Sequence, residues 1–135
     1  MKPPINIEPV KLSREELLKG VELICKCLYQ KRFRFNEEIG LQLAIAEELK
    51  YQEIRFVREV RLSPKDRIDF MCGPIGIEVK IFGSTSDVTR QLWRYAQLPQ
   101  IDAMILVTTR SVHRDVPAEI LEKPVFIVHL LNSIF

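Results

Sequence analysis

The strongest structural constraint in this chain is an alternation of polar and apolar side chains within residues 67–81, RIDFMCGPIGIEVKI. Apolar side chains alternate with Asp69 before the interruption at 72–74 and with Glu78 and Lys80 after it. Period-two alternation is typical of half-buried strands, and Cys-Gly-Pro is typical of a turn. The segment is therefore predicted to form two short strands joined by a tight hairpin.

A hairpin loop over residues 72–75 sets the register of these two strands. Phe70 then pairs with Ile77, and Asp69 lies directly opposite Glu78. Lys80 projects from the same face as Glu78, because side chains two residues apart share a face of a strand. Opposed Cβ atoms are only about 5 Å apart, and like charges at that distance are destabilising. A cation between the two carboxylates would remove this cost, whereas a register shift of one residue would separate them.

Two carboxylates and a lysine in this arrangement suit metal-assisted hydrolysis of a phosphodiester. Mg²⁺ prefers oxygen ligands and is commonly held by one or two carboxylates together with phosphate oxygens and water. Lys80 could neutralise the charge that develops on the phosphate or position the attacking water. The alternative is an ordinary salt-bridged strand face, in which Asp69 pairs with Lys80 and Arg67 pairs with Glu78.

Length and composition predict one globular domain over residues 1–135. Hydrophobic residues make up 47% of the 135, which is typical of a folded protein. The net charge of +2 indicates that any positive surface must come from local clustering. Three cysteines without metal-ligand spacing, together with no signal-like or membrane-spanning apolar run, predict an intracellular, cytoplasmic protein.

Helix and strand patterns extend over the rest of the chain. A capping-box match from Ser13 to Glu16 predicts an N-terminal extra helix over about 13–32. Asn36 is predicted to cap a second helix that ends near Lys50. Further predictions are a strand at 53–62, a helix at 87–98, a buried strand at 102–109, a short helix or turn at 117–122 and a C-terminal strand at about 125–130.

The resulting order is α-α-β-β-β-α-β-(α)-β. Antiparallel strands come first, and a helix then crosses over to a strand that is apolar on both faces. This order predicts an α/β fold with a central mixed β-sheet flanked by helices on both faces.

The ordered motifs resemble those of the PD-(D/E)XK nuclease superfamily, which has the restriction-endonuclease-like fold. Asp69 matches the aspartate of that family, and Glu78 with Lys80 matches its ExK element. The usual preceding proline is replaced by Ile68. Gln91 and Tyr95, on the helix that follows the ExK strand, look like the Q-x-x-x-Y element of RecB-like nucleases. The resemblance covers a core of about residues 36–110.

The resemblance implies a metal site and a catalytic set. Asp69 and Glu78 would bind Mg²⁺ or Mn²⁺, with the backbone carbonyl of Val79 as a further ligand and Lys80 as a catalytic residue. A carboxylate from the helix before the sheet often completes the metal shell in this family. Glu38 is favoured because it lies near the helix start, beside Ile39 and one turn before Gln42. Three other glutamates compete, at 37, 47 and 48, and Glu38 could instead be a solvated helix-start residue.

The resemblance also implies a nucleic-acid-binding helix. Gln91 and Tyr95 would contact the substrate backbone, and Arg90 and Arg94 could reach phosphates. The alternative is that Tyr95 is a core aromatic and Gln91 a surface residue.

The function expected from the resemblance is that of a Mg²⁺- or Mn²⁺-dependent deoxyribonuclease. Its expected partner is DNA, and so small a chain could work as a homodimer or as a subunit of a larger repair or replication complex. The alternatives are a Holliday-junction resolvase of the same superfamily and a non-catalytic domain of this fold that binds nucleic acid or a partner.

Overall fold

The structure is a computed structural model that describes residues 11–130. Within that range the chain forms three α-helices, one 3-10 helix and six strands. In chain order these are α1 (Arg14–Tyr29), α2 (Glu38–Tyr51), β1 (Val57–Arg61), β2 (Arg67–Cys72), β3 (Ile75–Lys80), α3 (Thr85–Ala96), β4 (Ala103–Thr108), η1 (Ser111–Asp115), β5 (Glu119–Ile120) and β6 (Lys123–His129).

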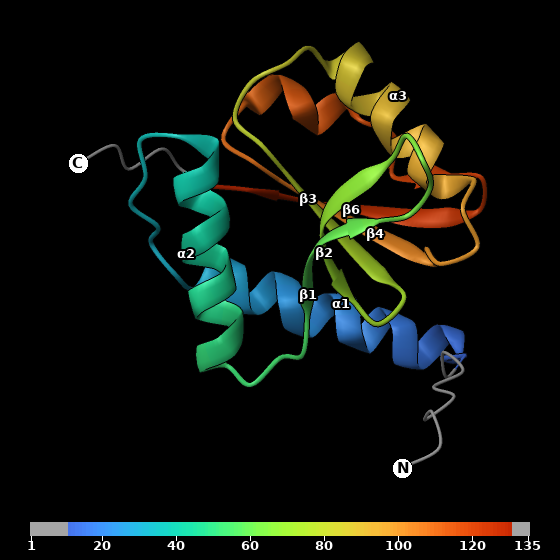
Figure 1. Cartoon of the computed structure of the whole chain (residues 1–135), viewed down its shortest axis with the longest axis horizontal. Coiled ribbons are helices and arrows are strands. Elements are labelled where there is room, and N and C mark those ends of the chain that lie inside the picture. Colours follow the sequence, from blue (N-terminus) through green and yellow to red (C-terminus); the bar gives the residue numbers. More distant parts are fainter. Residues whose placement is uncertain (1–10, 131–135) are drawn as a thin grey trace.

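The strands form one mixed sheet, in the spatial order β1-β2-β3-β4-β6-β5. Neighbours β1, β2 and β3 are antiparallel, as are β5 and β6. The central strands β3, β4 and β6 are parallel, and α3 provides the crossover from β3 to β4 (Figure 1). The predicted mixed sheet is therefore confirmed, with the β1–β2 and β2–β3 hairpins preceding the parallel pairs along the chain.

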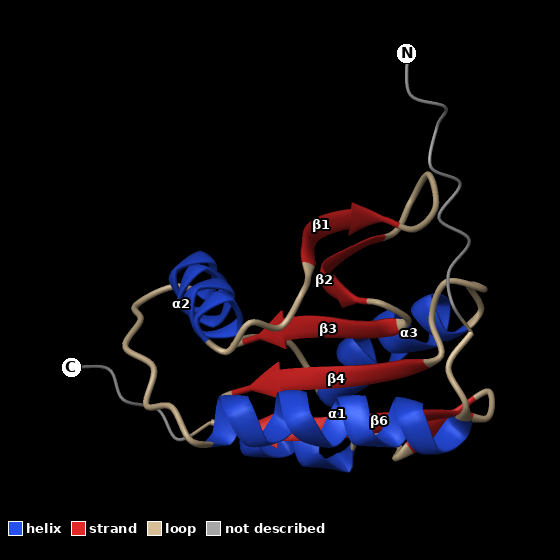
Figure 2. Ribbon diagram, turned by 90° about the horizontal axis from the view of Figure 1, so that it is seen from below, coloured by secondary structure: helices blue, strands red, loops and turns tan. Residues whose placement is uncertain are grey.

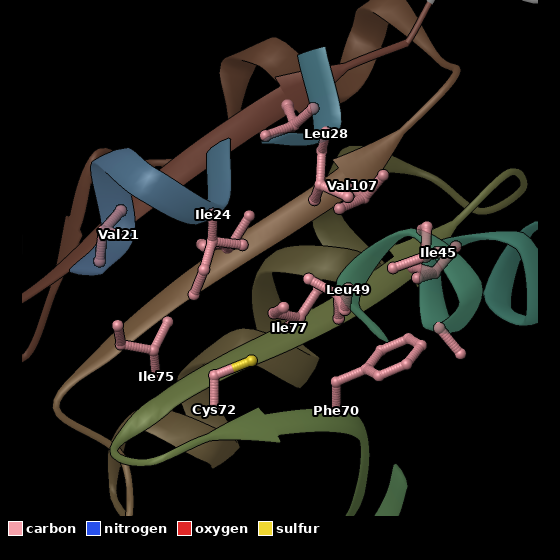
Figure 3. Close-up of a cluster of buried hydrophobic side chains, with 14 of the residues drawn as sticks. Val21, Ile24, Leu28, Ile45, Leu49, Phe70, Cys72, Ile75, Ile77 and Val107 are labelled. Carbon is pink, nitrogen blue, oxygen red and sulfur yellow. The ribbon is translucent and has the colours of Figure 1, made fainter. Parts of the chain in front are cut away.

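Helices cover both faces of the sheet. Figure 2 shows α1 in front of β4 and β6, and α3 behind the sheet. The first core lies between the sheet and the pair α1 and α2, and side chains such as Ile24, Leu49 and Ile77 meet there (Figure 3). A second core joins α3 to the opposite face through Leu92, Leu106 and other buried residues. Alternate side chains of β4 thus enter different cores, whereas β3 contributes apolar side chains to the first core alone.

The start of α1 follows from its sequence. The Ser13 hydroxyl accepts a hydrogen bond from the N–H of Glu16 at 3.1 Å, and the Glu16 carboxylate accepts one from the N–H of Ser13 at 3.1 Å. This reciprocal pair satisfies two N–H groups at the helix start, so the predicted capping box is confirmed. Within residues 11–130, no helix combines the length and the apolar character that crossing a membrane requires.

One local prediction is wrong, and a second, a short helix or turn at 117–122, is confirmed only in part. The N-cap of α2 is Glu37 rather than Asn36, and it makes no side-chain capping bond. The segment 117–122 contains the short strand β5 and a turn, while the helical residues lie earlier, in the 3-10 helix η1. Pairing with the edge of β6 explains the second difference, because Glu119 and Ile120 gain sheet hydrogen bonds that a two-turn helix could not offer.

Candidate active site

The hairpin register brings Asp69 and Glu78 together as predicted. Pairing runs from Cys72↔Ile75 through Met71↔Gly76 to Phe70↔Ile77, and the next residues on the two strands are Asp69 and Glu78. Pairing also includes Cys72 and Ile75, so the loop is only Gly73-Pro74, shorter than the loop 72–75. Gly73 has φ +56°, a conformation that glycine adopts without a Cβ penalty.

Side chains connect the two strands beyond this point. The N–H of Val79 donates to Asp69 Oδ2 at 2.7 Å, and the N–H of Asp69 donates to Glu78 Oε1 at 3.3 Å. Each carboxylate is therefore anchored by the backbone of the opposite strand. On the other side of β2, Glu59 occupies the place opposite Asp69 and has φ +50°, which is unusual for a residue with a Cβ.

Both carboxylates lie in a region that disfavours negative charge. The Glu78 side chain is only 4% exposed. Its burial, reinforced by the charge of Asp69, raises the pKa of Glu78 to about 8. Burial also raises the pKa of Asp69, and the charge of Glu38 adds to that effect. A cation beside these groups would favour their ionised forms, so the site is electrostatically suited to a positive ligand.

Lys80 provides one positive charge at this site. Its Nζ lies 3.4 Å from Glu78 Oε2, and its side chain is 24% exposed. Ile77 and Val79 enter the core beneath α1 and α2, so alternation places Glu78 and Lys80 on the α3 side of β3. Among residues 11–130, no ion pair within 4.0 Å joins Asp69 to Lys80 or Arg67 to Glu78. The diagonal salt bridges of the alternative interpretation are thus not formed.

Glu38 is the helix glutamate that reaches this part of the sheet. It is the first residue of α2, and its Oε1 accepts a hydrogen bond from the N–H of Ile81 at 3.1 Å, just past the end of β3. Glu37 and Glu47 are exposed, and Glu48 accepts a hydrogen bond from Gln52. One reason given for Glu38 is wrong, however. Its neighbour Ile39 is 48% exposed, whereas the residues that α2 buries are Leu41, Gln42, Ile45, Ala46 and Leu49.

Tyr95 is buried inside the protein, whereas the prediction placed it on the surface in contact with nucleic acid. Its side chain is 1% exposed, and its hydroxyl oxygen lies 2.9 Å from the Arg67 carbonyl and 3.3 Å from Glu78 Oε2. The Gln91 amide donates to the same hydroxyl at 2.8 Å. The predicted direct contact of Tyr95 with nucleic acid is therefore wrong, because a buried hydroxyl engaged by three protein groups has no surface to offer. Its position instead allows it to orient Glu78.

The two arginines of α3 already have acidic partners. Arg94 Nε bonds Asp66 Oδ1 at 3.0 Å, and Arg90 Nη2 bonds Asp87 Oδ1 at 2.8 Å. The hydrogen bond from Arg94 lowers the pKa of the Asp66 side chain. The backbone of Asp66 closes the turn between β1 and β2. Arg94 thus ties α3 to this turn. A phosphate contact by either arginine stays a prediction.

The donor atoms of the site fit a hard cation, although a complete metal shell is not assembled. Within residues 11–130, no cluster of three or more His, Cys, Asp and Glu side chains is arranged to hold a metal ion. Glu38 is engaged with Ile81, so the close carboxylate pair is Asp69 and Glu78. Two carboxylates plus substrate oxygens and water are a common way of holding Mg²⁺. Val79 lies on β3 between Glu78 and Lys80, and the role of its carbonyl as a metal ligand stays a prediction.

A buried histidine beside the site carried no functional signal in the sequence. His113 is 0% exposed; its Nε2 lies 2.8 Å from the Gly83 carbonyl and its Nδ1 lies 2.6 Å from Thr108 Oγ1. Its partners are 30 and 5 residues away, on different elements. No local pattern in the sequence indicates this connection.

Comparison of the chain with protein-family models, with curated proteins and with solved structures finds no match.

Proposed function

We propose that this chain is a divalent-metal-dependent nuclease of the PD-(D/E)XK superfamily, with the restriction-endonuclease-like fold, and that it hydrolyses phosphodiester bonds in DNA. The observation that carries the proposal is the interleaved pair Asp69 and Glu78, each held by the backbone of the opposite strand, with Lys80 Nζ 3.4 Å from Glu78. Burying two carboxylates next to one another raises the pKa of both, and carboxylates perturbed in this way cluster at sites that bind a cation or exchange a proton.

In this proposal each residue has a distinct task. Asp69 and Glu78 would hold Mg²⁺ or Mn²⁺, with Glu38 as a third acidic group. The bound cation would polarise the phosphate and lower the pKa of a water molecule. Lys80 would donate hydrogen bonds to the phosphate oxygens as negative charge develops on them. Tyr95 and Gln91 would keep the Glu78 carboxylate in one orientation through the hydroxyl contact at 3.3 Å.

A cleavage assay tests the proposal. The purified chain is incubated with end-labelled single-stranded, duplex, flap and four-way DNA, and with RNA of the same sequence, in Mg²⁺, Mn²⁺ or EDTA. We expect cleavage of DNA with either metal, none in EDTA, and none by Asp69→Asn. Cleavage confined to four-way DNA would identify a junction resolvase. Binding without cleavage of any substrate would contradict the proposal and favour a non-catalytic domain.

A further inference from the structure

Phe82 is an exposed aromatic residue next to the candidate catalytic strand. It follows Lys80 by two residues, and 71% of its side chain is exposed. Within residues 11–130, its ring takes part in neither the aromatic pair nor the cation–π contact of the fold, both of which involve Phe70. A single exposed apolar residue needs no explanation by itself. The manner in which the chain holds Phe82 is what distinguishes it.

Hydrogen bonds fix the backbone on both sides of Phe82. The N–H of Ile81 donates to Glu38 Oε1 at 3.1 Å, and the Ile81 side chain is buried. On the other side, the Gly83 carbonyl lies 2.8 Å from His113 Nε2. A carbonyl only accepts, so Nε2 carries the hydrogen, and Nδ1 accepts from the Thr108 hydroxyl at 2.6 Å. The ring is thus presented to solvent from an anchored segment.

Two cationic residues lie close to Phe82, one along the chain and one just after the neighbouring strand β4. Thr108 pairs with Lys80 across β3 and β4, and its hydroxyl oxygen accepts a hydrogen bond from the N–H of Arg110 at 3.0 Å. The Arg110 side chain is exposed, and within the described range it has no carboxylate within 4.0 Å. Lys80, at the end of β3, and Arg110, just after the end of β4, therefore provide two cations for a phosphate backbone.

We propose that Phe82 stacks on an unpaired nucleobase beside the cleaved phosphate, so that the substrate is a nucleic acid with unpaired nucleotides at the cut: a single strand, a flap or a frayed end. Aromatic rings flanked by cations bind single strands in this way, because every base has a π-face and every nucleotide a phosphate. A base inside a duplex is already stacked and must first be extruded. The inference rests on the proposed nuclease function and names its substrate class.

Binding measurements separate this inference from nuclease activity. Cleavage is blocked with EDTA, and fluorescence anisotropy gives the affinity for a labelled single strand and for a blunt duplex of the same sequence. We expect Phe82→Ala to weaken single-strand binding on the order of tenfold and to leave duplex binding unchanged. Phe82→Trp should retain the wild-type preference. Tyr51→Ala is the matched control, because Tyr51 is an exposed aromatic (82%) at the opposite end of α2 from Glu38, and it should change neither affinity.

A thermal melt shows whether Phe82→Ala acts through folding; an exposed side chain predicts an unchanged midpoint. Equal affinity of wild type and Phe82→Ala for the single strand would overturn the inference, and so would equal losses for single strand and duplex. If the protein cleaves DNA but Phe82→Ala has no selective effect, only this inference fails. If no nucleic acid is cleaved but the single strand binds through Phe82, the nuclease proposal fails and the stacking surface remains.

Discussion

Asp69 and Glu78 occupy positions where two negative charges destabilise the fold unless something positive binds them. Each accepts a backbone N–H from the facing strand, so neither can turn away from the other without losing a hydrogen bond. An unsatisfied buried donor costs about 1–3 kcal/mol. The hairpin therefore holds the two carboxylates together although their ionised forms are disfavoured there, as the raised pKa of each shows. Such cost at a small cluster of residues is what a binding or catalytic site requires.

Lys80→Ala should abolish most cleavage without unfolding the chain. The lysine is partly exposed and, within residues 11–130, pairs with Glu78 alone, so its removal opens no cavity in the core. Loss of one group that stabilises transition-state charge lowers the rate on the order of a hundredfold. Single-turnover cleavage, with circular dichroism as a check of folding, measures the effect. Lys65→Ala is the control, because Lys65 is an exposed lysine in the β1–β2 turn. A wild-type rate for Lys80→Ala would show that Lys80 is only the partner of Glu78.

At the scale of elements, α3 supports the site from behind. Tyr95 connects this helix to both strands of the hairpin, through the Arg67 carbonyl and the Glu78 carboxylate. Burial raises the pKa of Tyr95, and the negative charges of Glu78 and Asp69 raise it further. The hydroxyl therefore stays protonated near neutral pH.

Tyr95→Phe should lower stability by about 1–2 kcal/mol and also weaken metal binding, because Glu78 loses the group that orients it. Chemical denaturation and Mn²⁺ titration measure the two effects separately. Tyr29→Phe is the control, because it removes a hydroxyl that donates to the Ile127 carbonyl at 2.8 Å. Tyr29 and Ile127 both lie outside the candidate site. If Tyr95→Phe loses stability and still binds metal as wild type does, Tyr95 is a core residue without a positioning role.

The contact of Arg94 with Asp66 makes a pH-dependent contribution to stability. Arg94 lowers the pKa of Asp66 below its ordinary value of 3.8. A carboxylate with a lowered folded-state pKa stabilises the fold above its unfolded pKa, and the stabilisation is lost as pH falls through the folded pKa. Arg94→Gln should thus lower the free energy of unfolding by up to about 1 kcal/mol at pH 7, and the difference from wild type should disappear in acid, below the lowered folded-state pKa of Asp66. Urea unfolding of both proteins at pH 7 and in acid measures the difference in stability. A difference that is independent of pH would mean that Arg94 contributes through packing.

At the scale of the whole molecule, features set by neighbouring residues were predictable from the sequence. The capping box and the hairpin register depend on contacts between residues only a few positions apart, and both are confirmed. The apolar run of β4 is buried at all six positions, as a central parallel strand requires.

Features decided by long-range packing were not predictable in the same way. Ile39 and Leu43 fall at helical spacing but are exposed, because α2 turns its other side to the core. The Q-x-x-x-Y motif predicts that Tyr95 contacts nucleic acid at the surface, yet Tyr95 is buried against the hairpin. The partners of Arg94 and His113 in these contacts, Asp66 and Gly83, lie 28 and 30 residues away along the chain. Helix periodicity identifies an apolar stripe, whereas the direction in which that stripe faces depends on the other elements.

The most direct test of the central claim, that Asp69 and Glu78 jointly hold a divalent cation, is a thermal melt with and without Mn²⁺. An ion that binds only the folded state stabilises it by about 2.7 kcal/mol at 100 times its dissociation constant. We expect a higher melting temperature for the wild type with Mn²⁺ and no change for Asp69→Asn, which retains an oxygen for the Val79 N–H but removes the charge. Equal shifts in the wild type and Asp69→Asn would contradict the claim.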